Sequence, residues 1–220
     1  MTTPGRPLAD ALAEVRERVA AAERRSGRAP GAVTLVAATK TVPVVRIAEV
    51  VGLGVLDVGE NRAQELLAKA PALAGTAPAP RWHFLGTLQR NKVRALVPWV
   101  CCWHSLDRAE LAVELARRAP GTRVLVEVNL GREATKAGCD PAGLTALVAL
   151  AATAGLEVAG LMTVPPRDGE PRRWFARLRE LAVEHGLAEL SMGMSDDFEI
   201  AVEEGATMVR LGRVLFGARP

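Results

Sequence analysis

Short apolar runs and longer amphipathic segments alternate along most of this chain. Apolar runs typical of buried strands occur at about residues 34–39, 55–59, 81–86, 99–104, 123–129, 156–163, 187–192 and 207–211. Segments with helical spacing follow at about 43–51, 61–69, 89–96, 107–118, 140–154, 171–185 and 196–204, with a short turn at the end. The strand runs are continuous rather than alternating, as expected for parallel strands that are covered on both faces.

An amphipathic helix precedes the first strand, with apolar residues recurring from Leu8 to Val19 and a helix-end signal at Ser26-Gly27. Eight strand–helix units favour a closed barrel over an open Rossmann-like sheet, and no G-x-G-x-x-G follows the first strand. We predict an α/β fold, a single (β/α)8 TIM barrel. Residues 1–220 would form one domain, with residues 1–27 as an extra N-terminal helix packed on the barrel, and residues 71–80 would form a loop within it.

Composition narrows the function classes. Hydrophobic residues make up 49% of the chain and charged residues 24%, the balance of an ordinary globular protein. The net charge of +3 comes from scattered arginines, so nucleic acid binding is not indicated. No segment has the length of a membrane span, and the start lacks the apolar core of a signal peptide.

Cys101, Cys102 and Cys139 have no metal-ligand spacing and read as small buried residues in a reducing compartment. We expect a cytoplasmic protein without a metal site.

Lysine is scarce, which makes each lysine informative. Lysine and arginine together number 28, yet only four are lysines: Lys40, Lys69, Lys92 and Lys136. Lys40 ends the first strand run, where barrel enzymes carry their active residues. An arginine cannot be deprotonated to a nucleophile, whereas a lysine can, so Lys40 indicates amine chemistry. The alternative is a lysine that only extends its charge into water.

Glycine-rich loops follow the seventh and eighth predicted strands, around residues 193–195 and 210–213. Barrel folds commonly bind phosphate at this place through backbone N–H groups. Ser195 fits such a loop, although it could equally cap the next helix. A lysine and a phosphate site on one rim suggest a phosphorylated carbonyl compound held as a Schiff base.

Together the segments at this rim resemble the pyridoxal phosphate homeostasis proteins, also called proline synthase co-transcribed homologues. The matching segments span nearly the whole chain: residues 38–41, 59–61, 82–86, 88–89, 91–92, 104–108, 135–138, 160–163, 191–197, 208–212 and 216–219. The resemblance implies a barrel like the N-terminal domain of alanine racemase, carrying pyridoxal 5′-phosphate (PLP) as an internal aldimine.

By position, the resemblance implies six cofactor-binding residues: Lys40 as the Schiff-base lysine, Asn61 lining the cofactor, Ser195 with the backbone of Gly212 and Arg213 at the phosphate, and Arg210 facing the pyridine nitrogen. Arg213 departs from the family, which commonly has a small hydroxyl residue there. A hydroxyl contact to the phosphate is therefore lost, although a cation beside a dianion could compensate.

The same residues favour a carrier over a catalyst. A cationic Arg210 at the ring nitrogen would oppose its protonation and weaken the cofactor as an electron sink. Racemisation also needs an acid–base group on each face of the substrate. Alanine racemases supply a tyrosine from a second domain, whereas this sequence contains no tyrosine. We therefore assign no catalytic residue.

We predict a PLP-binding protein of intracellular vitamin B6 homeostasis, which buffers the cofactor or delivers it to PLP-dependent apoenzymes. The alternatives are a PLP-dependent amino-acid racemase or other fold type III enzyme, a Schiff-base aldolase without cofactor, and a pure interaction module that binds no small molecule. His83 reads as a hydrogen-bonded core histidine, and His104 as either a core or a rim residue. Cys139 reads as inert, and Lys136 either as a solvated lysine or as an amine that exchanges the cofactor.

Overall fold

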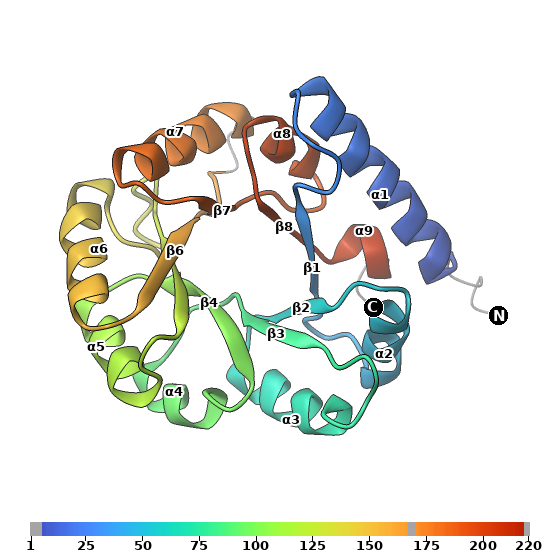
Figure 1. The fold of residues 1–220 in the computed structure, drawn as a ribbon, viewed down its shortest axis with the longest axis horizontal. Helices are drawn as coiled ribbons and strands as arrows, with labels where there is room; N and C mark the ends of the chain where they lie inside the picture. The colour runs from blue at the N-terminus through green and yellow to red at the C-terminus, as the bar shows by residue number, and fades with distance from the viewer. Residues whose placement is uncertain (1–5, 167–169, 218–220) are drawn as a thin grey trace.

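Eight parallel strands close into a barrel in the computed structural model, which describes residues 6–166 and 170–217 (Figure 1). The strands follow one another around the barrel in chain order, and β8 pairs with β1 to close it. Their bounds are β1 Thr34–Ala38, β2 Asp57–Glu60, β3 Arg81–Phe84, β4 Val100–Leu106, β5 Arg123–Glu127, β6 Glu157–Met162, β7 Glu189–Ser191 and β8 Met208–Leu211. The predicted fold class is confirmed. The assignment of residues 1–220 to one domain stays a prediction.

Helices surround the barrel, and α1 lies outside this ring against α8 and α9 (Figure 1). Their bounds are α1 Leu8–Arg25, α2 Val44–Gly52, α3 Ala63–Leu73, α4 Arg90–Leu96, α5 Ala109–Arg118, the 3-10 turn η1 Pro141–Gly143, α6 Leu144–Thr153, α7 Pro171–Glu184, α8 Phe198–Glu203 and α9 Arg213–Phe216. The prediction of a loop from residue 71 is wrong in its first part, because α3 continues through Pro71 to Leu73. Near the end of a helix, a proline gives up only one hydrogen bond of the last turn.

Local sequence explains where these helices begin and end. Pro171 opens α7, where its missing N–H would have no partner in any case. Pro120 comes two residues after the end of α5, and Gly121 takes the positive φ of 75° that lets the chain reverse toward β5. Prolines and glycines at the helix ends thus leave only short strands between the helices. The carboxyl ends of all these parallel strands lie at the same side of the barrel.

Apolar side chains form two separate clusters. The large cluster lies between the strands and the helices, and it includes the apolar face of α1. The small cluster draws on strands around the whole barrel, so it fills the barrel interior: Val36, Leu85, Cys102, Leu125, Met162 and Met208. This interior cluster lies beneath the carboxyl ends of the strands.

Residues two positions beyond the interior cluster point into the mouth of the barrel. Successive side chains of a strand face opposite sides, so Glu127 follows the inward direction of Leu125, and Arg210 that of Met208. Both are nearly buried, at 7% and 6% exposure. A carboxylate and a guanidinium thus enter the same mouth from β5 and β8.

Candidate functional site

Lys40 lies in a turn directly after β1, half-buried at the carboxyl end of the barrel. The N–H of Val42 donates to the carbonyl of Thr39 at 2.9 Å and closes this turn. Thr41 has a φ of 65°, in the left-handed region that β-branched residues rarely adopt. The Lys40 amine makes no hydrogen bond or ion pair with any described residue. The turn therefore presents a primary amine that no described residue engages.

The loops after β7 and β8 meet at Ser195. Its Oγ accepts a hydrogen bond from the N–H of Val214 in α9 at 3.2 Å. Ser195 does not cap α8, because that helix begins after Asp197 without a side-chain cap. The N–H groups of Gly212 and Arg213 have no acceptor within the described part of the chain. A hydroxyl and two N–H donors without a described acceptor thus lie at the same end of α9, and that they bind a phosphate stays a prediction.

The Arg213 side chain turns away from these donors. Its guanidinium pairs with the carboxylate of Asp196, and 59% of its side chain is exposed. Gly212 lies close to the neighbouring strand, since a Cβ at this position would be 3.2 Å from the carbonyl oxygen of Ala38. The contribution expected of Arg213 at this site is therefore its backbone N–H rather than its charge.

Arg210 lies at the inner side of the same mouth with its guanidinium fixed at one edge. One terminal nitrogen, Nη1, donates to the carbonyl and to the Oγ of Ser191, both at 2.7 Å. The other, Nη2, donates to the carbonyl of Thr163 at 2.9 Å. Burial lowers the pKa of Arg210 to about 10, so the guanidinium is still a cation at pH 7. Its Nε has no partner among the described residues and remains a donor for a ligand.

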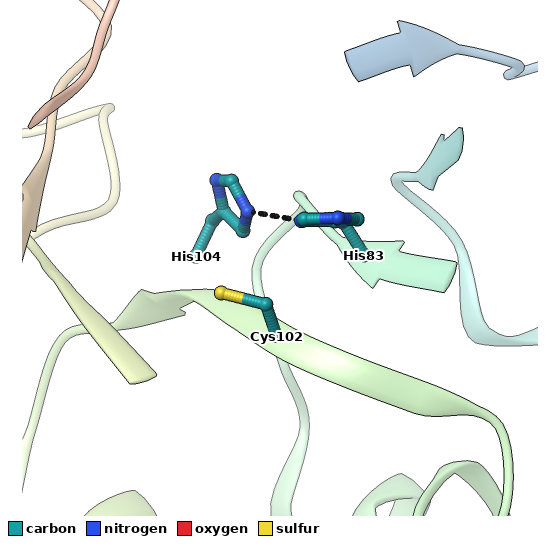
Figure 2. A group of neighbouring side chains, drawn as sticks. All are labelled: His83, Cys102 and His104. Carbon is teal, nitrogen blue, oxygen red and sulfur yellow. Dashed lines mark hydrogen bonds between the residues drawn. The ribbon is translucent and has the colours of Figure 1, made fainter. Parts of the chain in front are cut away.

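A chain of buried side chains continues from Arg210 through the barrel interior. Ser191 Oγ lies 2.8 Å from His104 Nδ1, and His104 Nε2 lies 2.8 Å from His83 Nδ1 (Figure 2). His83 Nε2 lies 3.0 Å from a carboxylate oxygen of Asp57, which Arg81 also binds. His83 is thus the hydrogen-bonded core histidine that was predicted. His104 is fully buried, which makes it a core residue as well.

The two histidines differ in protonation. Burial opposes the cation of His83, yet its hydrogen bonds, above all that to Asp57, raise the pKa of His83 to about 11. Burial and the two nearby cations, His83 and Arg210, lower the pKa of His104 well below its usual range. His83 therefore carries both protons, and it donates one to Asp57 and the other to His104.

Cys102 lies next to this histidine pair, and the three side chains form the one group of potential metal ligands in the described residues (Figure 2). Two histidine nitrogens bound to one tetrahedral zinc ion lie about 3.3 Å apart, given zinc–nitrogen bonds of about 2.0–2.1 Å. The observed 2.8 Å is the length of a hydrogen bond. A shared proton accounts for this contact better than a metal ion does.

Glu127 also lies in the barrel mouth, although the sequence analysis did not predict it as a site residue. Its carboxylate has no hydrogen bond or ion pair with a described residue. Burial raises the pKa of Glu127 to about 7, with a further contribution from Asp107 and an opposing one from Arg210. The available signal was its position at the end of an apolar strand, two residues after Leu125 and so on the same face of that strand.

Other candidate residues lie at or near the mouth. Asn61 follows β2 at the rim and is exposed. The Lys136 amine donates to the carbonyl of Pro165 at 2.9 Å and pairs with Glu133, so it is held rather than freely solvated. Burial raises the pKa of the Cys139 thiol to about 12, which agrees with an inert cysteine.

Two further expectations concern cysteines and membranes. The reading of all three cysteines as buried is wrong for Cys101, which is exposed, and Cys139 is only half-buried. Among the described residues, no helix is both long enough and apolar enough to cross a membrane.

Comparisons with known proteins bear on this geometry. The family model described as the N-terminal domain of alanine racemase matches residues 11–220. A pyridoxal phosphate homeostasis protein of Aquifex aeolicus is 45% identical, over 94% of this chain and 96% of the relative. The structure of PipY from Synechococcus elongatus with PLP bound has a TM-score of 0.84 and 35% identity, covering 96% of this chain and 100% of PipY.

Alanine racemase from Corynebacterium glutamicum shares the fold, with a TM-score of 0.69 at 22% identity, and this chain covers 61% of it. The match to the homeostasis proteins is closer in sequence and extends over nearly the full length of both partners. The chain therefore belongs to the pyridoxal phosphate homeostasis protein family, whose barrel is that of the alanine racemase N-terminal domain.

Proposed function

We propose that this protein binds PLP covalently through Lys40 and serves cytoplasmic vitamin B6 homeostasis as a buffer or donor of the cofactor. The observation that carries the proposal is the free Lys40 amine on the rim formed by β1, beside the unpaired N–H groups that follow β8. PipY, a relative of similar length, binds PLP in its solved structure. PLP supplies an aldehyde that condenses with an amine, and a phosphate that needs several donors.

The residues of the mouth suit each part of such a ligand. Ser195 and the N–H groups of Gly212 and Arg213 offer donors for a phosphate. Arg210 offers its Nε to a ring nitrogen from a guanidinium that Ser191 and Thr163 already hold in place. Asn61, exposed at the rim, would line the ligand. The donor set thus fits a phosphorylated aromatic aldehyde.

The protein's own groups also support binding without robust turnover. Arg210 stays cationic at pH 7, and a cation beside the ring nitrogen opposes protonation of that nitrogen. The sequence contains no tyrosine to act as the second acid–base group of an alanine racemase. On this proposal, Arg210 and the phosphate donors orient the ligand, and Lys40 holds it until a PLP-dependent apoenzyme receives it.

The test is covalent trapping. Purified protein mixed with PLP should develop a visible absorption band, and borohydride should fix the cofactor on the peptide that contains Lys40. Lys40→Ala should abolish the fixed cofactor, whereas Lys92→Ala, at a half-buried position on α4, should retain it. Full covalent occupancy in Lys40→Ala would refute the assignment.

One observation favours the alternative of a PLP-dependent racemase or another fold type III enzyme. Glu127 places a carboxyl with a pKa of about 7 in the mouth, and such a group can both give and accept a proton near neutral pH. Exchange of the α-hydrogen for deuterium in a panel of amino acids would reveal this activity. If wild-type protein exchanges deuterium and Glu127→Gln does not, the carrier proposal gives way to the enzyme.

A further inference from the structure

A buried ion cluster lies under the turn that carries Lys40. Its centre is Lys69 on α3, which is only 9% exposed. The Lys69 ammonium donates three hydrogen bonds: to Glu60 Oε1 at 2.7 Å, to Glu65 Oε2 at 2.9 Å and to the carbonyl of Thr39 at 2.9 Å. All three of its N–H groups are therefore used. We refer to Lys69, Glu60 and Glu65 as the Lys69 cluster.

Both carboxylates of the Lys69 cluster also bind the turn. Glu60 Oε1 accepts a hydrogen bond from the hydroxyl of Thr39 at 2.7 Å. Glu65 Oε2 accepts one from the backbone N–H of Thr41 at 2.7 Å. Thr39 and Thr41 are the residues immediately before and after Lys40. The Lys69 cluster thus holds the turn on both sides of the reactive amine.

This holding is needed because the turn is strained. Thr41 has a positive φ of 65°, where its Cβ crowds the backbone. Strained residues persist when the surrounding structure fixes them, and they concentrate at functional sites. Here the fixing contact is the hydrogen bond from the Thr41 N–H to Glu65. If Thr41 relaxed to a negative φ, the peptide between it and Lys40 would rotate, and the direction of the Lys40 side chain would change.

A purely structural role explains the Lys69 cluster poorly. Replacing a buried ion cluster with apolar residues is often neutral or stabilising, so α3 does not need one to pack on the barrel. Glu60 is fully buried, and its second oxygen, Oε2, has no hydrogen-bond partner. Among described residues, every side-chain hydrogen bond of the Lys69 cluster ends within it or on Thr39 and Thr41. Apart from an ion pair of Glu65 with Arg62 at 4.0 Å, its polar contacts are thus concentrated on the Lys40 turn.

We infer that Lys69, Glu60 and Glu65 are positioning residues for Lys40, which hold the strained turn in the conformation that directs the amine into the barrel mouth. This inference rests on the proposed covalent binding of PLP at Lys40. It predicts that capture of the aldehyde depends on the Lys69 cluster, whereas the contacts to the phosphate and the ring do not.

Glu65→Ala is the test variant, because it removes the acceptor of the Thr41 N–H at a partly exposed position. The rate at which the visible band appears after mixing with PLP should fall about tenfold, equivalent to about 1.4 kcal/mol. Pyridoxine 5′-phosphate lacks the aldehyde, so its affinity should stay within about twofold of wild type. Glu49→Ala on α2, whose carboxylate pairs with Arg46 at the surface, is the matched control and should match wild type in both assays.

Thr41→Gly supplies the rescue. Glycine adopts a positive φ without steric cost, so it keeps the turn without help from Glu65. Adding Thr41→Gly to Glu65→Ala should bring the capture rate back to within about threefold of wild type. Three results would overturn the inference: an unchanged rate in Glu65→Ala, no recovery in the double variant, or equal loss of pyridoxine 5′-phosphate binding. Absence of a band in the wild type would instead refute the proposed function.

Discussion

Replacing Glu127 by glutamine removes the one carboxyl of the barrel mouth that has neither a hydrogen bond nor an ion pair among described residues. The side chain is 7% exposed, so water does little to stabilise its charge. Glutamine keeps the shape of the protonated acid and cannot ionise. The substitution therefore isolates what the charge of Glu127 costs the folded protein.

The magnitude follows from the pKa of Glu127, which burial raises from 4.5 to about 7. At about 1.4 kcal/mol for each pKa unit, ionisation of this carboxyl costs the folded state about 3 kcal/mol. Between pH 4.5 and 7 the folded protein binds more protons at Glu127 than the unfolded chain does. The stability contributed by the protonated acid is therefore complete below about pH 4.5 and is lost as pH rises through 7.

Urea denaturation of cofactor-free protein between pH 4.5 and 8 measures this effect. The free energy of unfolding of Glu127→Gln should equal that of wild type near pH 4.5 and exceed it by about 3 kcal/mol at pH 8. Glu17→Gln, on the exposed face of α1, is the control and should show no such trend. A difference between Glu127→Gln and wild type that is constant with pH, or a wild type that is more stable at pH 8, would refute the reasoning.

Three other outcomes are expected. Asp57→Asn should lower the free energy of unfolding at pH 7 by about 3 kcal/mol in urea denaturation, because it leaves the buried cation of His83 without its carboxylate; a loss below 1 kcal/mol would contradict this. Gly86→Ala should lower the free energy of unfolding by about 1–3 kcal/mol and reduce PLP occupancy, because the new Cβ would lie 2.1 Å from the carbonyl oxygen of Asn61. The control Gly52→Ala on α2 should change neither, because its Cβ meets no atom within 4 Å. Chelator treatment should leave the melting temperature unchanged, and a rise on adding zinc would show that the interior histidines bind metal.

Much of the fold could be predicted from the sequence, because continuous apolar runs and helical spacing respond to burial. Element ends were less predictable. The apolar run at 55–59 begins before β2, because Val55 and Leu56 are apolar without belonging to the strand. The extension of α3 through Pro71 shows that a proline near the end of a helix does not mark its boundary.

Some features of the candidate site could likewise be predicted from the sequence, and others could not. Residues at strand ends, such as Lys40 and Arg210, could be placed at the mouth by their order in the chain. Their partners could not, because the contact of Arg210 with Thr163 depends on how strands 47 residues apart are aligned. Likewise, the buried ion pair of Lys69 and Glu60 joins helix α3 to the end of strand β2, and no periodic pattern in the sequence predicts this contact.

Because β1 pairs with β8, the chain can form the complete ligand site only late in its synthesis. Thr34 pairs with Met208, so the last strand closes the barrel only when nearly the whole chain is present. Lys40 lies on one side of this seam, whereas Arg210 and Gly212 lie on the other. A nascent or truncated chain would hold the amine without the opposing donors. Retention of the cofactor would then report that an individual molecule has finished folding.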